Sequence, residues 1–205
     1  MITVVKKVHF FGCFILLLSC LFLQSCAKYE AKPFNRPLGI SLKKDNISVS
    51  AHQLSGSECK YYFSKDLTDT SGYQVIHLTV KNHSSDPYVL DAHWIDLHLA
   101  SLKTINQKLS FNTPMYMLPW VAAALVFWPF LIGAGAAAYD CTNANREINN
   151  DLDSRGFSNN SIEVIRPQKQ INKFLFVARE NWRHSFKLIL INKRTNERSL
   201  FDVEL

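Results

Sequence analysis

The densest group of side chains suited to acid–base or metal chemistry lies between positions 91 and 98. It holds Asp91, His93, Asp96 and His98, which are two carboxylates and two imidazoles within eight residues. Such groups transfer protons or bind a metal ion when they converge on one point. Successive side chains of a strand alternate between its two faces, so His93 and His98 would lie on opposite faces. We therefore expect no shared metal ion here, and an exposed hydrogen-bonded pair of Asp96 and His98.

The sequence carries none of the strong motifs of catalysis. It has no Gly-x-Ser-x-Gly elbow, phosphate-binding glycine loop, His-Glu-x-x-His or Cys-x-x-Cys. Asp140 precedes Cys141, but no histidine is close in sequence to activate that thiol. We therefore expect a protein that is not an enzyme and that binds no cofactor.

Charge argues against nucleic acid as a partner. The chain has a formal net charge of +6, and the part after residue 26 has 21 basic and 17 acidic residues, a net charge of +4. These charges are scattered, whereas a nucleic-acid-binding surface gathers them into a patch or stripe. We expect no nucleic-acid partner.

The first 25 residues have the pattern of a secretory signal peptide. Lys6 and Lys7 supply the positive charges, and a mostly apolar stretch runs from residue 8 to residue 23. An apolar core of this length suits a signal peptide better than a retained membrane span. An uncleaved signal anchor is the alternative.

The apolar stretch ends in Leu23-Gln24-Ser25-Cys26, which resembles the lipobox of bacterial lipoproteins. The resemblance implies cleavage before Cys26 and its modification with a thioether-linked diacylglycerol and an amide-linked acyl chain. Each buried methylene adds about 0.8 kcal/mol, so several chains make a stable anchor in a lipid bilayer. Cleavage at the alternative Cys20 would leave three apolar residues on the mature end. Because Ala27 and not Asp follows Cys26, the resemblance also implies the outer membrane, facing the periplasm.

Two cysteines remain once the signal peptide and the lipidated residue are set aside. They are Cys59 and Cys141, and thiols in an oxidising compartment can pair. A disulfide across such a long loop would stabilise the fold by roughly 4 kcal/mol on the chain-entropy model. A Cys59–Cys141 disulfide and two free thiols are both open from the sequence.

The residues after position 26 predict a tether followed by a β domain. The segment 26–44 has two prolines and several charges, which indicates a lipidated tether. Farther on, alternating apolar residues and turn formers predict short strands. The expected strands span 47–52, 60–63, 73–80, 92–99, 108–111, 162–165, 174–177, 186–191 and 200–205, the last two forming a hairpin through 192–198. The sequons Asn46-Ile47-Ser48 and Asn82-His83-Ser84 would matter only in a eukaryotic source.

This layout predicts an antiparallel β-sandwich. The segment VIHLTVKNHSSDPYVLDAHWIDLHL, residues 75–99, resembles the immunoglobulin-like domains of small envelope lipoproteins in its pattern of strand, Asn-x-Ser turn, Pro and strand. The resemblance covers residues 45–111 and 161–205. It implies a mainly β fold, an immunoglobulin-like β-sandwich over 45–205, interrupted by an apolar helical insertion at about 113–155.

The insertion contains an uncharged stretch from residue 109 to residue 139. Its length reaches the roughly 20 residues of a transmembrane helix. A single crossing would, however, place the two halves of one β domain on opposite sides of a membrane. Pro119 and Pro129 favour two helical pieces, so we expect a hairpin or re-entrant segment, followed by an amphipathic helix over 143–152.

Three uses of residues 115–139 are open. The aromatic side chains could lie at a lipid interface, the small residues could let a partner helix approach closely, or the segment could pack back onto the β domain. The residues concerned are Trp120, Phe127, Trp128 and Phe130 for lipid, and Gly133 and Gly135 for a partner. The sequence thus predicts a lipid-anchored envelope lipoprotein whose insertion contacts the membrane or a neighbouring envelope protein. The alternative is a structural subunit of an envelope secretion or transport complex that docks through residues 115–139.

Overall fold

A computed structural model describes residues 27–34, 41–69, 71–125 and 128–205. The predicted signal peptide, Cys26 and Phe127 lie outside the described residues. The chain divides into two compact units, which we call the sheet unit (29–110 and 147–205) and the hairpin unit, whose main part is 111–146. Strands hold 35% and helices 34% of the described residues, so the expectation of a mainly β chain overlooked much of the helix.

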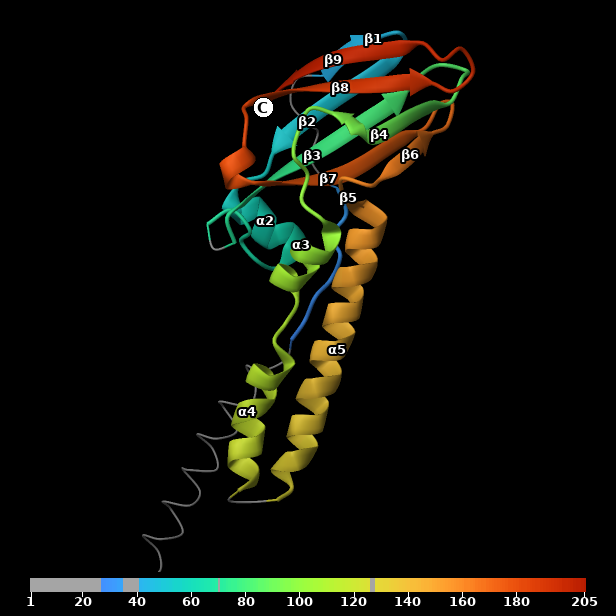
Figure 1. Cartoon of the computed structure of the whole chain (residues 1–205). Coiled ribbons are helices and arrows are strands. Elements are labelled where there is room, and N and C mark those ends of the chain that lie inside the picture. Colours follow the sequence, from blue (N-terminus) through green and yellow to red (C-terminus); the bar gives the residue numbers. More distant parts are fainter. Residues whose placement is uncertain (1–26, 35–40, 70, 126–127) are drawn as a thin grey trace, which may run out of the picture. The chain divides into compact units, whose positions relative to one another are not determined.

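The sheet unit contains two sheets (Figure 1). All strand pairs are antiparallel except β5 with β7. The first sheet has the order β1 (Ser41–Lys44), β2 (Ile47–Gln53), β3 (Tyr73–Asn82), β7 (Gln170–Ala178), β5 (Gly156–Phe157). The second has the order β6 (Ile162–Ile165), β4 (Tyr88–Ile95), β8 (Ser185–Asn192), β9 (Arg198–Glu204).

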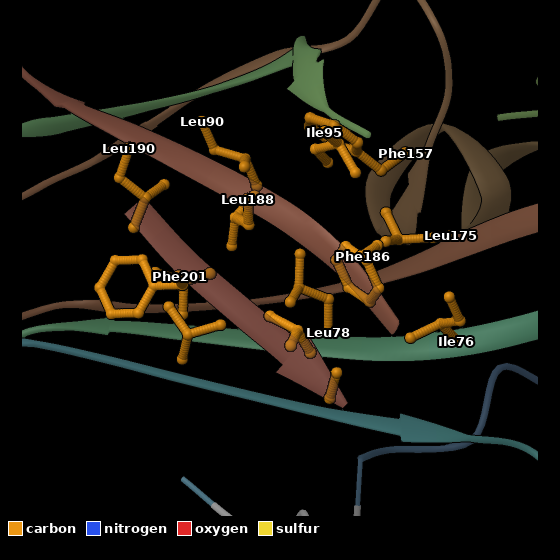
Figure 2. Close-up of a cluster of buried hydrophobic side chains, with 14 of the residues drawn as sticks. Ile76, Leu78, Leu90, Ile95, Phe157, Leu175, Phe186, Leu188, Leu190 and Phe201 are labelled. Carbon is orange, nitrogen blue, oxygen red and sulfur yellow. The ribbon is translucent and has the colours of Figure 1, made fainter. Parts of the chain in front are cut away.

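One apolar core joins the two sheets. Buried and exposed residues alternate along β9, as they must in a strand with one face inward. Figure 2 shows Ile76 and Leu78 of β3 in the same cluster as Leu188 of β8 and Phe201 of β9. Burying each such side chain contributes about 1.5–3 kcal/mol, so this shared core is what holds the sheets together.

Most of the predicted strands are present. The stretches 47–52, 73–80, 162–165, 174–177 and 186–191 lie within β2, β3, β6, β7 and β8, and 200–205 overlaps β9. β8 and β9 pair as the expected hairpin. The stretch 92–99 is displaced, because β4 begins at Tyr88, contains an irregularity between Leu90 and Ile95, and ends at Ile95.

Two predicted strands are absent. The stretch 60–63 belongs to α2 (Gly56–Phe63), which a capping box starts: the Ser55 hydroxyl accepts from the Glu58 amide, and the Glu58 carboxylate accepts from the Ser55 amide. No part of 108–111 is a strand: Lys108 and Leu109 end α3 (Leu102–Leu109), and residues 110 and 111 belong to no helix or strand. At 60–63, local capping therefore outweighed the β-favouring side chains. A short 3-10 helix, η1 (Arg179–Asn181), connects β7 to the rest of the chain.

The turn after β3 is organised by a buried asparagine. Asn82 is fully buried, and its side-chain amide donates to the carbonyl oxygens of Asp86 at 2.7 Å and Ile165 at 3.1 Å. Its side-chain oxygen accepts from the Ser84 amide at 2.9 Å. The expected Asn-x-Ser turn is thus built around one side chain whose hydrogen bonds are satisfied.

The expected tether over 26–44 is wrong for two stretches. Residues 41–44 form β1, which pairs with β2. Tyr29 is buried and Phe34 stacks on a buried histidine, His77, of β3. The aromatic residues of this segment pack on the sheet unit, whereas in a polar tether they would lie in water.

The hairpin unit contains α4 (Thr113–Ala124) and the first part of α5 (Phe130–Arg155). Pro129 directly precedes α5, as expected for a proline at a helix start, whereas Pro119 lies inside α4. The amphipathic stretch 143–152 is part of α5, and its Ile148 and Leu152 are both buried. None of the helices in the described part of the chain combines the length and hydrophobicity needed to cross a membrane.

Candidate functional site

The hairpin unit exposes large apolar side chains. Leu125 is 87% exposed, and Ile132 and Met115 are each 72% exposed. No residue of α4 is buried. Among the described residues, eight of the twelve large exposed apolar side chains lie in this segment: Met115, Leu118, Val121, Leu125, Trp128, Leu131, Ile132 and Tyr139. A surface of this kind marks a contact site for an apolar partner.

The exposed apolar surface is free of charge over a defined length. Lys108 and Asp140 are the charged residues nearest to it on either side. At a rise of 1.5 Å per residue, the twelve residues of α4 extend about 18 Å, and the uncharged part of α5, residues 130–139, about 15 Å.

Within the hairpin, Trp120 of α4 packs directly on Gly133 of α5. A Cβ atom at position 133 would lie 1.8 Å from Cε3 of Trp120, which leaves room only for glycine. The Trp120 ring also lies 6.5 Å from that of Phe130. The space at Gly133, which one of the three open uses left for a partner helix, is filled by Trp120 of the same hairpin. Gly135, by contrast, has open space around it.

The base of the hairpin is closed by an asparagine. The backbone amide of Phe111 donates to Oδ1 of Asn145 at 2.7 Å, and Nδ2 of Asn145 donates to the Phe111 carbonyl at 3.1 Å. Asn112 caps α4 by accepting from the Met115 amide. These hydrogen bonds satisfy the backbone at the hairpin base without any charged group.

Of the two states left open for Cys59 and Cys141, the structure has the free thiols. Cys59 and Cys141 are both free and buried, and they belong to different units, Cys59 to the sheet unit and Cys141 to the hairpin unit. Burial raises the pKa of Cys59 to about 12, and burial followed by the nearby Asp140 raises the pKa of Cys141. Both thiols are therefore protonated at neutral pH and poorly nucleophilic.

The group at 91–98 does not converge. His93 Nδ1 lies 2.8 Å from Asp91 Oδ1, and Asp96 pairs with Arg183 at 3.4 Å. The expected Asp96–His98 pair is replaced, because β4 ends at Ile95 and the residues beyond it no longer alternate as on a strand. In the described ranges, no three His, Cys, Asp or Glu side chains are placed to hold a metal ion.

A cluster in the sheet unit that sequence reasoning missed joins the N-terminal segment to the end of α5. The Tyr29 hydroxyl donates to Asp151 at 2.5 Å, and Arg155 forms an ion pair with the same carboxylate. Arg155 also donates to the Lys32 carbonyl at 2.5 Å. Burial, and after it the hydrogen bond to Asp151, raises the pKa of Tyr29 far above its usual value. The Tyr29 hydroxyl therefore stays protonated at neutral pH and donates its hydrogen bond.

Aromatic rings surround this ion pair. The Arg155 guanidinium carbon lies 5.1 Å from the centre of the Phe34 ring and 5.3 Å from that of Phe174, within the range of cation–π attraction. Phe34 stacks on His77 with ring centres 4.3 Å apart. Burial, followed by the charge of His52, lowers the pKa of His77 to about 4, so this imidazole is neutral at pH 7.

One sequence signal for this cluster exists. Asp151 and Arg155 are four residues apart, the spacing of an ion pair on one face of a helix. Nothing comparable links them to Tyr29, which is 122 residues from Asp151.

Comparison with protein-family models, with curated proteins and with solved structures found no match to this chain.

Proposed function

We propose that this chain is a lipid-anchored envelope lipoprotein whose hairpin inserts into one leaflet of the bilayer that carries its acylated Cys26. Its sheet unit would be an immunoglobulin-like β-sandwich standing in the periplasm, with the outer membrane as its support. The protein would act by binding and positioning, without catalysis.

The observation that carries this proposal is the exposed, uncharged hairpin. Leu125 and Trp128 at its tip are 87% and 71% exposed. Transferring apolar surface from water to hydrocarbon is favourable by roughly 25 cal/mol per Å². A lipid bilayer accepts such a surface without requiring a complementary shape.

The length of the two arms supports insertion into a single leaflet. The hydrocarbon core of a bilayer is about 30 Å thick, so one leaflet offers about 15 Å. The uncharged arms, about 18 Å and 15 Å long, match that depth. Lys108 and Asp140, which bound the uncharged stretch, would then reach the headgroups.

The acylation part is tested in the producing bacterium. Cells expressing the full chain are grown with an alkyne-tagged fatty acid, and wild type is compared with Cys26→Ala and Cys20→Ala. We expect label on wild type and Cys20→Ala and none on Cys26→Ala. Label that survives in Cys26→Ala would contradict lipid attachment at Cys26.

The insertion part is tested by fluorescence quenching. The purified lipoprotein is reconstituted into phosphatidylethanolamine–phosphatidylglycerol vesicles with brominated acyl chains. The emission of Trp128 is taken as the difference between wild type and Trp128→Phe. We expect the bromines to quench more than half of the Trp128 emission. Efficient quenching by aqueous acrylamide, with none by the brominated lipid, would contradict insertion.

A matched pair of variants controls for exposed apolar residues in general. Leu125→Glu with Trp128→Glu places charges at the hairpin tip, whereas Ile162→Glu with Val164→Glu changes residues of β6 that are also exposed, by 62% and 45%. We expect only the tip variant to protect Trp120 from quenching by brominated lipid. A stoichiometric protein bound to the hairpin in native mass measurements would favour the alternative, a subunit of an envelope secretion or transport complex.

A further inference from the structure

Residues 29–34, which we call the strap, are fastened to the sheet unit at three points. The Tyr29 hydroxyl binds Asp151, the Lys32 carbonyl accepts from Arg155, and Phe34 stacks on His77. The carbonyl oxygen of Tyr62 lies 3.2 Å from the same hydroxyl and is a second, more distant acceptor for its one hydrogen. The exposed residues Glu30, Ala31 and Pro33 lie between these points.

The partners of the strap are preorganised. Asp151 and Arg155 lie on one face of α5 and pair with each other, and Phe174 is a buried residue of β7, which lies between β3 and β5 in its sheet. The hydrogen bond of Tyr29 reaches a buried carboxylate, and bonds to charged acceptors are the stronger ones. Removing the strap would leave Asp151 with one fewer donor and open the aromatic cluster to water.

Chain geometry gives this contact a consequence for the lipid anchor. Cys26 is three residues from Tyr29, and three residues span at most about 11 Å. If the strap were loose, the first fixed point would be Ser41 of β1, fifteen residues from Cys26 and as much as about 50 Å away. Docking of the strap therefore shortens the maximum reach of the anchor several-fold.

We infer that the strap is a fixed spacer, which holds the sheet unit within about 11 Å of the lipid-attachment residue. The inference rests on the proposed acylation of Cys26 for its meaning at the membrane, but the docking itself does not require the lipid. Its partner surface is the part of the sheet unit formed by Asp151, Arg155, His77 and Phe174. A protein held in this way works at the membrane surface and does not reach across the periplasm.

Docking is tested by a distance measurement on the full chain. Spin labels are placed at Ala31→Cys in the strap and Asn159→Cys in the sheet unit, both exposed positions, while Cys59 and Cys141 are buried. We expect one narrow distance distribution, and a broad one reaching longer distances after Tyr29→Ala with Phe34→Ala. A broad distribution in the unmodified strap would overturn the inference.

The control is Lys32→Ala, because the Lys32 side chain is not the group that Arg155 binds. It should keep the narrow distribution. Tyr29→Ala alone is the milder variant if the double change prevents folding, and a distribution as narrow as in wild type would then contradict the inference.

The effect on height is tested in vesicles. A donor dye at Asn159→Cys and an acceptor on the lipid headgroups report the distance of the sheet unit from the bilayer, in the Leu125→Glu, Trp128→Glu background so that the hairpin does not contribute. We expect energy transfer to fall at least twofold when Tyr29→Ala and Phe34→Ala release the strap. If Cys26 is not acylated but the strap is docked, the spin labels still give the narrow distribution while the alkyne-tagged fatty acid is not incorporated. Failure of acylation is thereby distinguished from failure of docking.

Discussion

Trp120 covers Gly133 so closely that a Cβ atom at position 133 would lie 1.8 Å from Cε3 of the ring. Two helices that pack through a glycine under an indole ring fix both the distance and the register of a hairpin. The contact therefore turns an apolar stretch into an element of defined shape, with Leu125 and Trp128 at its end.

Gly133→Ala should separate the two arms. The new methyl group forces the Trp120 ring away, and overpacking of this kind costs typically about 1–3 kcal/mol. We expect a red shift and loss of intensity of Trp120 fluorescence, measured in Trp128→Phe to remove the neighbouring signal. Gly135→Ala is the matched control: it has open space around it, and alanine favours a helix over glycine by up to about 1 kcal/mol. Equal effects of the two changes would contradict the contact.

Tyr29→Phe should weaken the sheet unit without changing its shape. The variant removes the hydrogen bond to Asp151 and keeps the ring, and Asp151 retains Arg155 as partner. We expect the free energy of unfolding in urea to fall by about 1–2 kcal/mol. The matched variant Tyr61→Phe alters an exposed neighbour in α2 and should change it by less than about 0.5 kcal/mol.

His77 should make the sheet unit sensitive to acid. Its pKa is about 4 in the folded protein, against about 6.5 for an unperturbed imidazole, because of burial first and the charge of His52 second. Between these values the unfolded chain binds a proton that the folded one does not. Stability is therefore complete above pH 6.5 and falls as the pH drops toward 4, by an amount on the order of 2–3 kcal/mol.

The control for this pH dependence is His77→Phe, which keeps an aromatic ring on Phe34 and removes the titrating group. Urea unfolding of both proteins is followed between pH 4 and pH 7. The slope of stability against pH should be smaller in the variant over this whole window. Parallel curves for the two proteins would rule out His77 as the source of the acid sensitivity.

The two buried cysteines should be titratable as thiols. For a chain processed as proposed, with the signal peptide removed and Cys26 acylated, we expect two reactive thiols in denaturant without reductant, and one in Cys59→Ser. In the folded protein their reaction with a thiol reagent should be about 100-fold slower, since both are buried and protonated. A count of zero in denaturant would show that Cys59 and Cys141 are paired.

Periodicity predicted the strands whose one face is buried. Phe186, Leu188 and Leu190 alternate with more exposed residues in β8, and a polar connection of suitable length leads to β9. Such strands can be recognised from the sequence, because apolar residues on the core face alternate with polar residues on the solvent face. The uncharged stretch after Lys108 likewise predicted an apolar hairpin with proline near its turn.

Elements set by capping or by distant contacts were harder to predict. Tyr61, Tyr62 and Phe63 favour a strand by composition, yet Ser55 and Glu58 start a helix there. That signal was present in the sequence and was outweighed by the aromatic residues. The strap could not be predicted for another reason: Tyr29 and Asp151 are 122 residues apart in sequence, so no local pattern relates them.

The buried turn around Asn82 has a consequence for producing the protein. Nδ2 of Asn82, which donates to Asp86 and Ile165 in the folded chain, is the atom that a eukaryotic oligosaccharyltransferase would modify in Asn82-His83-Ser84. A sugar attached there during translocation would occupy a side chain that is fully buried in the native state. Secretion from yeast or insect cells should therefore trap an unfolded glycoprotein, whereas bacterial expression leaves this amide free to close the turn.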